Sequence, residues 1–377
     1  MDAVLRGIEK TKNFYQMKKD SPLVMKEFGY YSLDRWAREG YIDKEKKKDP
    51  NYLRELFGFD YPGEAYLQCL GWCEAAFCPD FEIKVIEDRG KYEVVQDHAG
   101  RYVLYFKGRR DGFMPEYLDH PVKDMESWKR NCEWRMDPLA PGREKLLENN
   151  LNHVIKSRDR GMFITQKVIG GYMYLRSLMG PERVLYMFYD DPELIHMCMR
   201  KWFELADYVT AYFQKEVTID QLFLAEDICY NRGLLISPDM IREFLLPYYK
   251  QLIENIKKRQ IDRSRHLFIQ IDTDGFADPA IDVYLEIGMD VMSPFEVAAN
   301  CDVLRTAEKY PELRITGGMD KRVLATTKDE IDKMVDRICS VMRKRGGYIP
   351  TCDHGVPEEV SFENYMHFRK RLLEYSV

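Results

Sequence analysis

The sequence predicts an α/β protein built on a (β/α)8 TIM barrel, preceded by an N-terminal cap that contains a small antiparallel β-meander. Short, continuously apolar strand candidates alternate with amphipathic helix candidates through the second half of the chain, which is typical of a parallel sheet covered by helices. The 377 residues are enough for one large barrel with an additional segment. We therefore expect residues 1–150 to form the cap and residues 151–377 to form the main part of the barrel, within one structural domain.

The cap segment has the composition of a meander. Runs rich in β-branched and aromatic residues cover residues 81–86, 91–96 and 101–106, and the turns Asp-Arg-Gly and Asp-His-Ala-Gly separate them. Short turns of this kind favour antiparallel neighbours. The stretch PLAPG at residues 138–142 is typical of a connection, here between the cap and the barrel.

Helix start signals recur between the strand candidates that follow. Asp191 and Pro192 supply a cap and a first-turn proline, and Ser237 precedes a second helix that Pro247 is expected to kink. Further helices are expected from Asp278, Asp302, Thr327 (with Glu330 as a capping box) and Ser361. The strand candidates are residues 162–169, 222–225, 266–271, 290–293, 313–316 and 347–350. At least six β/α units follow, and a closed barrel is favoured over an open sheet.

Composition excludes several classes of partner. Lys and Arg total 57 against 63 Asp and Glu, so the net charge of −6 argues against nucleic acid. The N-terminus carries charge where a signal peptide would be apolar, and no apolar run reaches the ~18 residues of a membrane span. We expect a cytoplasmic protein without a membrane partner. The nine scattered cysteines lack a CxxC pair and are expected to be reduced and mostly buried, with Cys352 as the exception.

Polar residues follow the expected strands at the end where barrel enzymes place their sites. Successive strands run into Glu226 and Asp227; Asp272 and Asp274; Glu296; Gly317, Gly318 and Lys321; and Cys352, Asp353 and His354. Carboxylates that converge on one mouth lose solvation and repel one another, so a metal, Lys321 or protonation must compensate. A divalent metal is the simplest answer, and oxygen ligands with one histidine suit zinc, manganese or iron(II). The alternative is that these acids cap helices or pair with arginines.

Several motifs between Glu226 and Tyr365 resemble a known group of proteins. They are EDICYNRGLLISP from residue 226, DTDG from 272, PFEVAA from 294, GGMDKR from 317 and GGYIPTCDHGVP from 346. Together they resemble the uroporphyrinogen decarboxylase-like superfamily, and within it the branch of corrinoid-dependent methyltransferases. The resemblance covers at least residues 160–377. The decarboxylase itself carries an arginine motif near its N-terminus, and the only similar residues here, RWAR at 35–38, stand in an unrelated setting.

The resemblance also implies a metal site. Related methyltransferases hold zinc with an H-x-C pair and a later cysteine; here Gln270 and Asp272 stand at the pair, Glu296 near an intervening glutamate, and His354 at the later cysteine. The implied zinc ligands are therefore Asp272, Glu296 and His354. Replacing thiolates by oxygen and nitrogen gives a harder site, better suited to polarising an oxygen than to activating a thiol.

These observations lead to a functional hypothesis. The protein is expected to move a methyl group from a small donor, with a methoxylated aromatic compound as one candidate, to the cobalt(I) of a corrinoid held by a separate protein. Glu226, Asp227, Asp274 and Tyr230 would position the donor or supply a proton. Gln270, Gly317, Gly318 and Lys321 would bind substrate or corrinoid, although the two glycines fit a tight turn equally well. A homodimer is a further expectation.

Two alternatives stay open. The first is a metal-independent lyase, similar to uroporphyrinogen decarboxylase, that acts on a porphyrin-like acid. The second is a non-catalytic protein that binds a corrinoid or a substrate. The chain lacks the D-x-H-x-x-G signature of a corrinoid carrier, so the methyltransferase hypothesis requires the corrinoid to come from another polypeptide.

Overall fold

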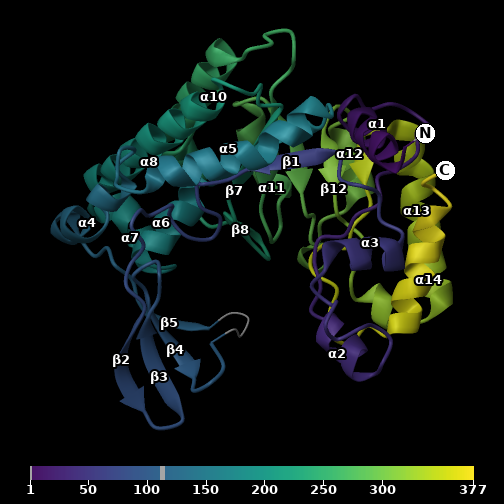
Figure 1. Ribbon diagram of the computed structural model, residues 1–377, viewed down its shortest axis with the longest axis horizontal. Coiled ribbons are helices and arrows are strands. Elements are labelled where there is room, and N and C mark those ends of the chain that lie inside the picture. The colour runs from purple at the N-terminus through teal and green to yellow at the C-terminus, as the bar shows by residue number, and fades with distance from the viewer. Residues whose placement is uncertain (1, 111–114) are drawn as a thin grey trace.

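The computed structural model describes residues 2–110 and 115–377, and its centre is a curled parallel sheet of seven strands (Figure 1). In order across the sheet, the strands are β1 (Glu64–Leu67), β6 (Phe163–Ile169), β7 (Gln221–Ala225), β10 (Phe268–Asp272), β11 (Met289–Ser293), β12 (Arg314–Thr316) and β13 (Tyr348–Ile349). All neighbouring pairs are parallel. The α/β class and the barrel-like parallel sheet are confirmed.

The space between the first and last strands of the sheet is occupied by the chain near residue 26. Val24 packs in one small cluster with Ile349 of β13, and the Lys26 ammonium lies 3.8 Å from a Glu64 carboxylate oxygen of β1. The backbone N–H of Cys352 donates to the Glu27 carboxylate at 2.8 Å. Residues 24–27 therefore lie where an eighth strand would close a (β/α)8 barrel. A closed cylinder of eight strands stays a prediction.

Six of the seven strands were predicted, within two residues at most of the bounds found here. The strand that sequence patterns missed is β1, four residues long and half-polar, EAYL. It belongs to the first 150 residues yet pairs with β6 in the central sheet. The cap segment thus contributes one strand to the barrel, and a boundary near residue 150 stays a prediction.

The antiparallel meander is confirmed and has one strand more than predicted. It consists of β2 (Lys84–Arg89), β3 (Tyr92–Gln96), β4 (Tyr102–Phe106) and β5 (Glu116–Asp119), paired in this order. It extends away from the barrel (Figure 1). A two-stranded hairpin, β8 (Cys229–Tyr230) and β9 (Gly233–Leu234), follows β7.

Helices cover the sheet, and their starts match the predicted caps. The side chains of Asp191, Ser237, Asp302, Thr327 and Ser361 each accept a backbone N–H of the first helical turn. At Pro247 the expected kink is a break between α9 and α10. The helices are α1 (Ala3–Tyr15), α2 (Leu33–Arg38), α3 (Pro50–Phe57), α4 (Met125–Asn131), α5 (Arg143–Asp159), α6 (Gly171–Met179), α7 (Arg183–Asp190), α8 (Pro192–Phe213), α9 (Pro238–Phe244), α10 (Leu246–Arg259), α11 (Asp278–Leu285), α12 (Val303–Lys309), α13 (Lys328–Arg345) and α14 (Phe362–Leu373).

The N-terminal helix closes the base of the barrel. The Tyr15 ring at the end of α1 stacks on Phe163 at 4.5 Å between ring centroids and lies 4.6 Å from Phe268. Its hydroxyl donates to the Glu64 carboxylate at 2.7 Å. The Arg314 side chain also donates two hydrogen bonds to the Tyr15 carbonyl. These contacts fill the amino-terminal end of the barrel, so polar groups remain accessible at the opposite end.

Two further findings concern composition. None of the helices in residues 2–110 and 115–377 is long and apolar enough to cross a membrane. All nine cysteines are free, as expected, and seven of them are buried. Cys352 is one of these seven, so the sequence-based distinction between it and the other cysteines is wrong.

The packing at the base of the barrel gives a stability prediction. Tyr15→Ala removes a fully buried ring from between two aromatic side chains, and we expect it to lower the free energy of unfolding by about 3–5 kcal/mol. Urea denaturation followed by circular dichroism measures this change. Tyr189→Ala, at a side chain that is 77% exposed, is the control and should change stability little. Equal effects of the two substitutions would contradict the proposed role of Tyr15.

Candidate active site

A cavity of about 540 Å³ lies at the carboxyl ends of the parallel strands. Such a volume is in the range of sites for small organic ligands. Five residues predicted from sequence line it: Asp227, Gln270, Asp272, Asp274 and His354. Its other lining residues include Lys26, Glu27, Phe28, Tyr66, Trp72, Cys73, Lys167, Met173, Phe223, Ser293, Thr316 and Thr351.

A chain of hydrogen bonds across the barrel interior supports the floor of this cavity. Thr165 donates to the Gln221 side chain, Gln221 donates to Gln270 at 2.7 Å, and Gln270 donates to the Ser293 hydroxyl at 2.8 Å. Ser293 in turn donates to the Asp272 carboxylate. Gln270 is therefore held mainly by its neighbours, although it also lines the cavity. Burial raises the pKa of Asp272 to about 6, against the opposing effect of the Ser293 hydrogen bond.

Asp274 is a cavity-lining acid whose pKa lies above neutral pH. Burial raises its pKa to about 8, and the carboxylates of Asp227, Glu296 and Asp272 contribute to this rise in that order. At pH 7 the Asp274 carboxyl is therefore mostly protonated. It faces the cavity from the loop after β10.

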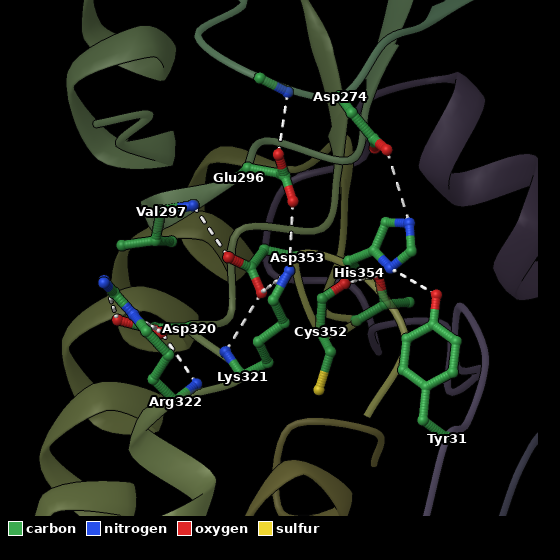
Figure 2. A network of polar contacts seen from close by, with 12 residues as sticks. Tyr31, Asp274, Glu296, Val297, Asp320, Lys321, Arg322, Cys352, Asp353 and His354 are labelled. Atoms are coloured by element: carbon green, nitrogen blue, oxygen red, sulfur yellow. Dashed lines mark hydrogen bonds and ion pairs between the residues drawn. The ribbon is translucent and has the colours of Figure 1, made fainter. Parts of the chain in front are cut away.

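His354 connects Asp274 to the surface (Figure 2). Its Nε2 lies 3.5 Å from an Asp274 carboxyl oxygen, and its Nδ1 lies 3.1 Å from the Tyr31 hydroxyl. Burial, followed by the Lys321 charge, lowers the pKa of the imidazole, so the ring is neutral at pH 7. A neutral imidazole between a carboxyl group and a partly exposed hydroxyl is able to pass a proton between them.

A second group of charged side chains lies beside Asp274 and His354, as Figure 2 shows. The Lys321 ammonium lies 3.1 Å from a Glu296 oxygen and 4.0 Å from an Asp353 oxygen. Glu296 also accepts the Gly275 N–H at 2.9 Å, and the buried Asp353 carboxylate accepts the backbone N–H groups of Val297 and Lys321. Lys321 thus neutralises acids of the loops after β11 and β13.

The predicted zinc ligands do not fit a common metal site. Asp272 is bound to Ser293, Glu296 to Lys321 and Gly275, and His354 to Asp274 and Tyr31. Among residues 2–110 and 115–377, no three His, Cys, Asp or Glu side chains gather closely enough to hold a metal ion. The expected cationic compensation comes instead from Lys321, hydrogen bonds and protonation. We derive no step through zinc.

Glu226 lies beneath the site and does not line the cavity. Its fully buried carboxyl accepts the Tyr172 N–H at 2.8 Å and the Tyr249 hydroxyl at 2.5 Å, at the start of α6. Burial raises its pKa to about 7. A carboxyl group that receives backbone N–H groups at the start of a helix stabilises that helix. The arrangement thus assigns Glu226 a structural place, separate from the predicted catalytic one.

Five other predicted residues also lie outside the lining of the cavity: Tyr230, Glu296, Gly317, Gly318 and Lys321. Tyr230 is 45% exposed in the β8–β9 hairpin. Gly317 and Gly318 have positive φ angles of 106° and 75°, and a Cβ would lie 1.9 Å from the Pro294 carbonyl oxygen and 2.1 Å from Val303, respectively. The protein's own close packing requires these glycines, which favours the tight-turn interpretation. Asp227 does line the cavity, with an Arg176 nitrogen 2.5 Å away.

Sequence reasoning missed the cationic part of the cavity. The Lys167 ammonium lies over the rings of Tyr66, Trp72 and Phe223, at 4.4, 4.7 and 5.8 Å from their centroids. Lys26 also lines the cavity, and it belongs to residues 24–27, which lie in space between strands β13 and β1. One available signal was a lysine inside the apolar strand FITQKVI, where a charged residue is rare.

The buried Glu226 gives a prediction for the pH dependence of stability. A pKa of about 7 in the folded protein, above the ordinary 4.5, means that the folded state holds an extra proton between these values. This contribution to stability is present below about pH 4.5 and is lost as the pH rises through about 7. The stability of Glu226→Gln relative to the wild type should therefore increase between about pH 5 and about pH 8. Urea titrations at several pH values measure this difference, with the exposed Glu55→Gln as a control expected to show a constant difference. A constant difference for Glu226→Gln as well would contradict the assignment.

Comparison with known proteins places the chain among relatives. Uroporphyrinogen decarboxylase of Legionella pneumophila (strain Corby) is 26% identical over 184 residues, which cover 48% of this chain and 49% of the relative. Uroporphyrinogen decarboxylase of Hydrogenobaculum sp. (strain Y04AAS1) is 23% identical over 190 residues, 50% of each chain. The chain thus spans about half the length of the curated relatives it matches.

Structure and family models extend this similarity. A methyltransferase from Methanosarcina mazei shares the fold, with a TM-score of 0.56, 13% identity and coverage of 97% of both chains. The family model described as Uroporphyrinogen decarboxylase (URO-D) matches residues 148–375, more than half of the chain. The superfamily resemblance seen in the sequence motifs is confirmed, and the protein belongs to the uroporphyrinogen decarboxylase (URO-D) family.

Proposed function

We propose that this protein is a methyltransferase that removes a methyl group from an oxygen of a small aromatic donor and passes it to a corrinoid carried by a separate protein. The observation that carries the proposal is the position of the Asp274 carboxyl, which faces an aromatic-lined cavity at the mouth of the barrel, where burial raises its pKa to about 8. The fold shared with a methyltransferase agrees with this activity. The corrinoid partner, a homodimer and a cytoplasmic location are parts of the same hypothesis.

The chemistry needs an acid at the leaving oxygen. The reduced corrinoid of the partner supplies the nucleophile, a cobalt(I) centre, for the methyl carbon. As the new bond to the methyl carbon forms, the methyl–oxygen bond breaks and its electron pair stays on the oxygen. Asp274 gives its proton to that oxygen, so the product leaves as a neutral hydroxyl compound. A carboxyl group with a pKa near the working pH is well matched to this task.

His354 and Tyr31 supply a route for restoring the proton. After the transfer Asp274 is a carboxylate, and the neutral His354 ring lies between it and the partly exposed Tyr31 hydroxyl. A proton taken from solvent reaches Asp274 through these two side chains. This arrangement supports repeated turnover of the acid.

The cavity walls favour an aromatic donor. Trp72 and Phe28 line the cavity with 40% and 41% of their surfaces exposed, and Phe223 lies beside Trp72 at 5.4 Å between ring centroids. Exposed aromatic surface in a concave site gains free energy when an apolar ligand covers it. An aromatic ring is therefore a better fit than a small polar donor such as an alcohol.

A second candidate function is decarboxylation of a porphyrin-like acid. The names of the curated relatives favour it, and a protonated Asp274 would also be suited to protonating the carbon that loses CO2. The cavity lining includes Lys26 and Lys167 but no arginine among the described residues. Release of CO2 from a porphyrinogen acid, without loss of methyl groups from any donor, would favour this candidate. Binding without either reaction would favour a non-catalytic protein.

Asp274→Asn tests the proposed acid. We expect the rate of methyl transfer to fall by about 10²–10⁴-fold, because the amide has no acidic proton to give. The rate of the wild type should decrease as the pH rises through about 8, since the acid form of Asp274 is the active one. Loss of cobalt(I) absorbance after adding 4-methoxyphenyl donors to a reduced corrinoid protein measures the rate.

Two controls distinguish acid catalysis by Asp274 from a general effect of lost negative charge and from catalysis by a metal. Asp239→Asn, at an exposed carboxylate on α9, should retain the wild-type rate. Treating the wild type with a chelator should leave the rate unchanged if Asp274, and not a metal, stabilises the leaving oxygen. An Asp274→Asn protein with full activity, or a wild type inactivated by the chelator and restored by zinc, would reject the proposed chemistry.

A further inference from the structure

Lys167 stands out as a cation in the cavity whose ammonium forms no close ion pair among the described residues. It projects from β6 into the mouth of the barrel, where three aromatic rings surround one side of its ammonium. Among the described residues its ammonium forms no hydrogen bond and no ion pair, although the charges of Glu64 and Asp272 act on it from farther away. Because Lys167 also lines the cavity, a ligand is able to reach its ammonium group.

Burial raises the free-energy cost of a lysine ammonium that has no oxygen acceptor. Burial lowers the pKa of Lys167 and the nearby charge of Lys26 lowers it further, while the carboxylates of Glu64 and Asp272 oppose this effect. The rings stabilise the ammonium by cation–π contacts, but they accept none of its three N–H groups in the manner of an oxygen atom. A desolvated cation whose N–H groups lack acceptors gains most from an anion that completes its hydrogen bonding.

Lys26 adds a second positive charge to the same end of the cavity. It lines the cavity, and its ammonium lies 3.8 Å from a Glu64 oxygen. Glu64 already accepts hydrogen bonds from the Tyr15 and Tyr66 hydroxyls, at 2.7 and 2.8 Å. Glu64 therefore has several donors, and its single negative charge faces the two positive charges of Lys26 and Lys167.

Asp274, the proposed proton donor, lies in a different part of the cavity. Asp274 comes from the loop after β10, whereas Lys167 and Tyr66 belong to the neighbouring strands β6 and β1. The strand β7, with Phe223, separates β6 from β10. A ligand that spans the cavity therefore meets ammonium groups near β6, aromatic surface beside them and a proton donor beyond β10.

We propose that Lys167, assisted by Lys26, binds a carboxylate group of the donor and so fixes the donor's orientation in the cavity. The carboxylate lies on Lys167, the aromatic ring lies against Trp72 and Phe223, and the oxygen that bears the methyl group is directed toward Asp274. The assignment names the substrate class of the proposed function, an aromatic acid with a methyl-bearing oxygen, and its orientation part depends on that function. The lysine–carboxylate contact does not depend on methyl transfer.

Direct binding, without any corrinoid, tests the lysine–carboxylate contact. The probes are 4-methoxybenzoate and its neutral counterpart 4-methoxybenzyl alcohol, and the readouts are isothermal titration calorimetry and the fluorescence of the cavity residue Trp72. We expect the wild type to bind the acid at least about 10-fold more tightly than the alcohol, because the acid adds charged hydrogen bonds. Lys167→Met should remove about 10- to 100-fold of affinity for the acid and leave affinity for the alcohol unchanged.

Matched variants make the result specific. Lys167→Arg keeps the charge and should retain preference for the acid, and Lys26→Met should lower affinity for the acid by a smaller factor than Lys167→Met. Lys250→Met, at an exposed position on α10, should bind both probes as the wild type does. If Lys167→Met fails to fold, the wild-type preference and the Lys167→Arg variant still decide the matter.

The outcomes distinguish this inference from the proposed function. Equal binding of acid and alcohol by the wild type, or an equal loss of both in Lys167→Met, overturns the carboxylate site. Preference for the acid that depends on Lys167, together with no transfer to any reduced corrinoid, supports the site and rejects the methyltransferase. Transfer from the alcohol as fast as from the acid at limiting concentration supports the activity and rejects the carboxylate requirement.

Discussion

The constraint on which the site depends is the gathering of carboxyl groups at one end of a barrel whose other end is sealed. Each acid loses water by burial, and each has a different compensation. Asp272 receives the Ser293 hydroxyl, Asp353 receives two backbone N–H groups, and Glu296 receives Lys321. Burial, followed by the carboxylates of Asp227, Glu296 and Asp272, raises the pKa of Asp274 to about 8. The proposed acid is therefore a consequence of how its neighbours are satisfied.

The closed base of the barrel confines the buried acids and their partners to the opposite end. The Tyr15 ring and the layer of Gln221 and Gln270 fill the barrel below the cavity, so the polar groups that line it lie at the opposite end of the barrel. Hydrogen bonds between side chains that are themselves held in place fix the floor geometry. A rigid floor lets the short loops after the strands carry the reactive groups while the barrel fixes their spacing.

Local patterns in the sequence predicted most of the fold, and long-range placement explains what they missed. Asp191, Ser237 and Thr327 cap the predicted helices because a cap depends on neighbours in sequence. The strand β1 is short and half-polar, and its identity as a strand depends on pairing with β6 nearly a hundred residues away. Asp274, Asp272 and His354 were rightly placed at the strand ends, but whether Glu226 turns toward the cavity or beneath α6 depends on Tyr249, which no local pattern reveals. Lys26 lies in the N-terminal segment, and no local pattern in the sequence reveals that it lines the cavity.

Family membership fixes the architecture and leaves the chemistry to the individual site. The motif positions that hold metal ligands in related methyltransferases are occupied here by Gln270 and Asp272, and both are engaged in hydrogen bonds across the barrel floor. In the proposed reaction the leaving oxygen needs a proton, and that proton is useful when the donor arrives in one orientation. Lys167 near β6 and Asp274 beyond β10 are proposed to meet these two needs from different parts of one cavity. In this proposal, binding by charge and protonation by an acid act on the same donor, because the orientation that the charge imposes places the oxygen at the acid.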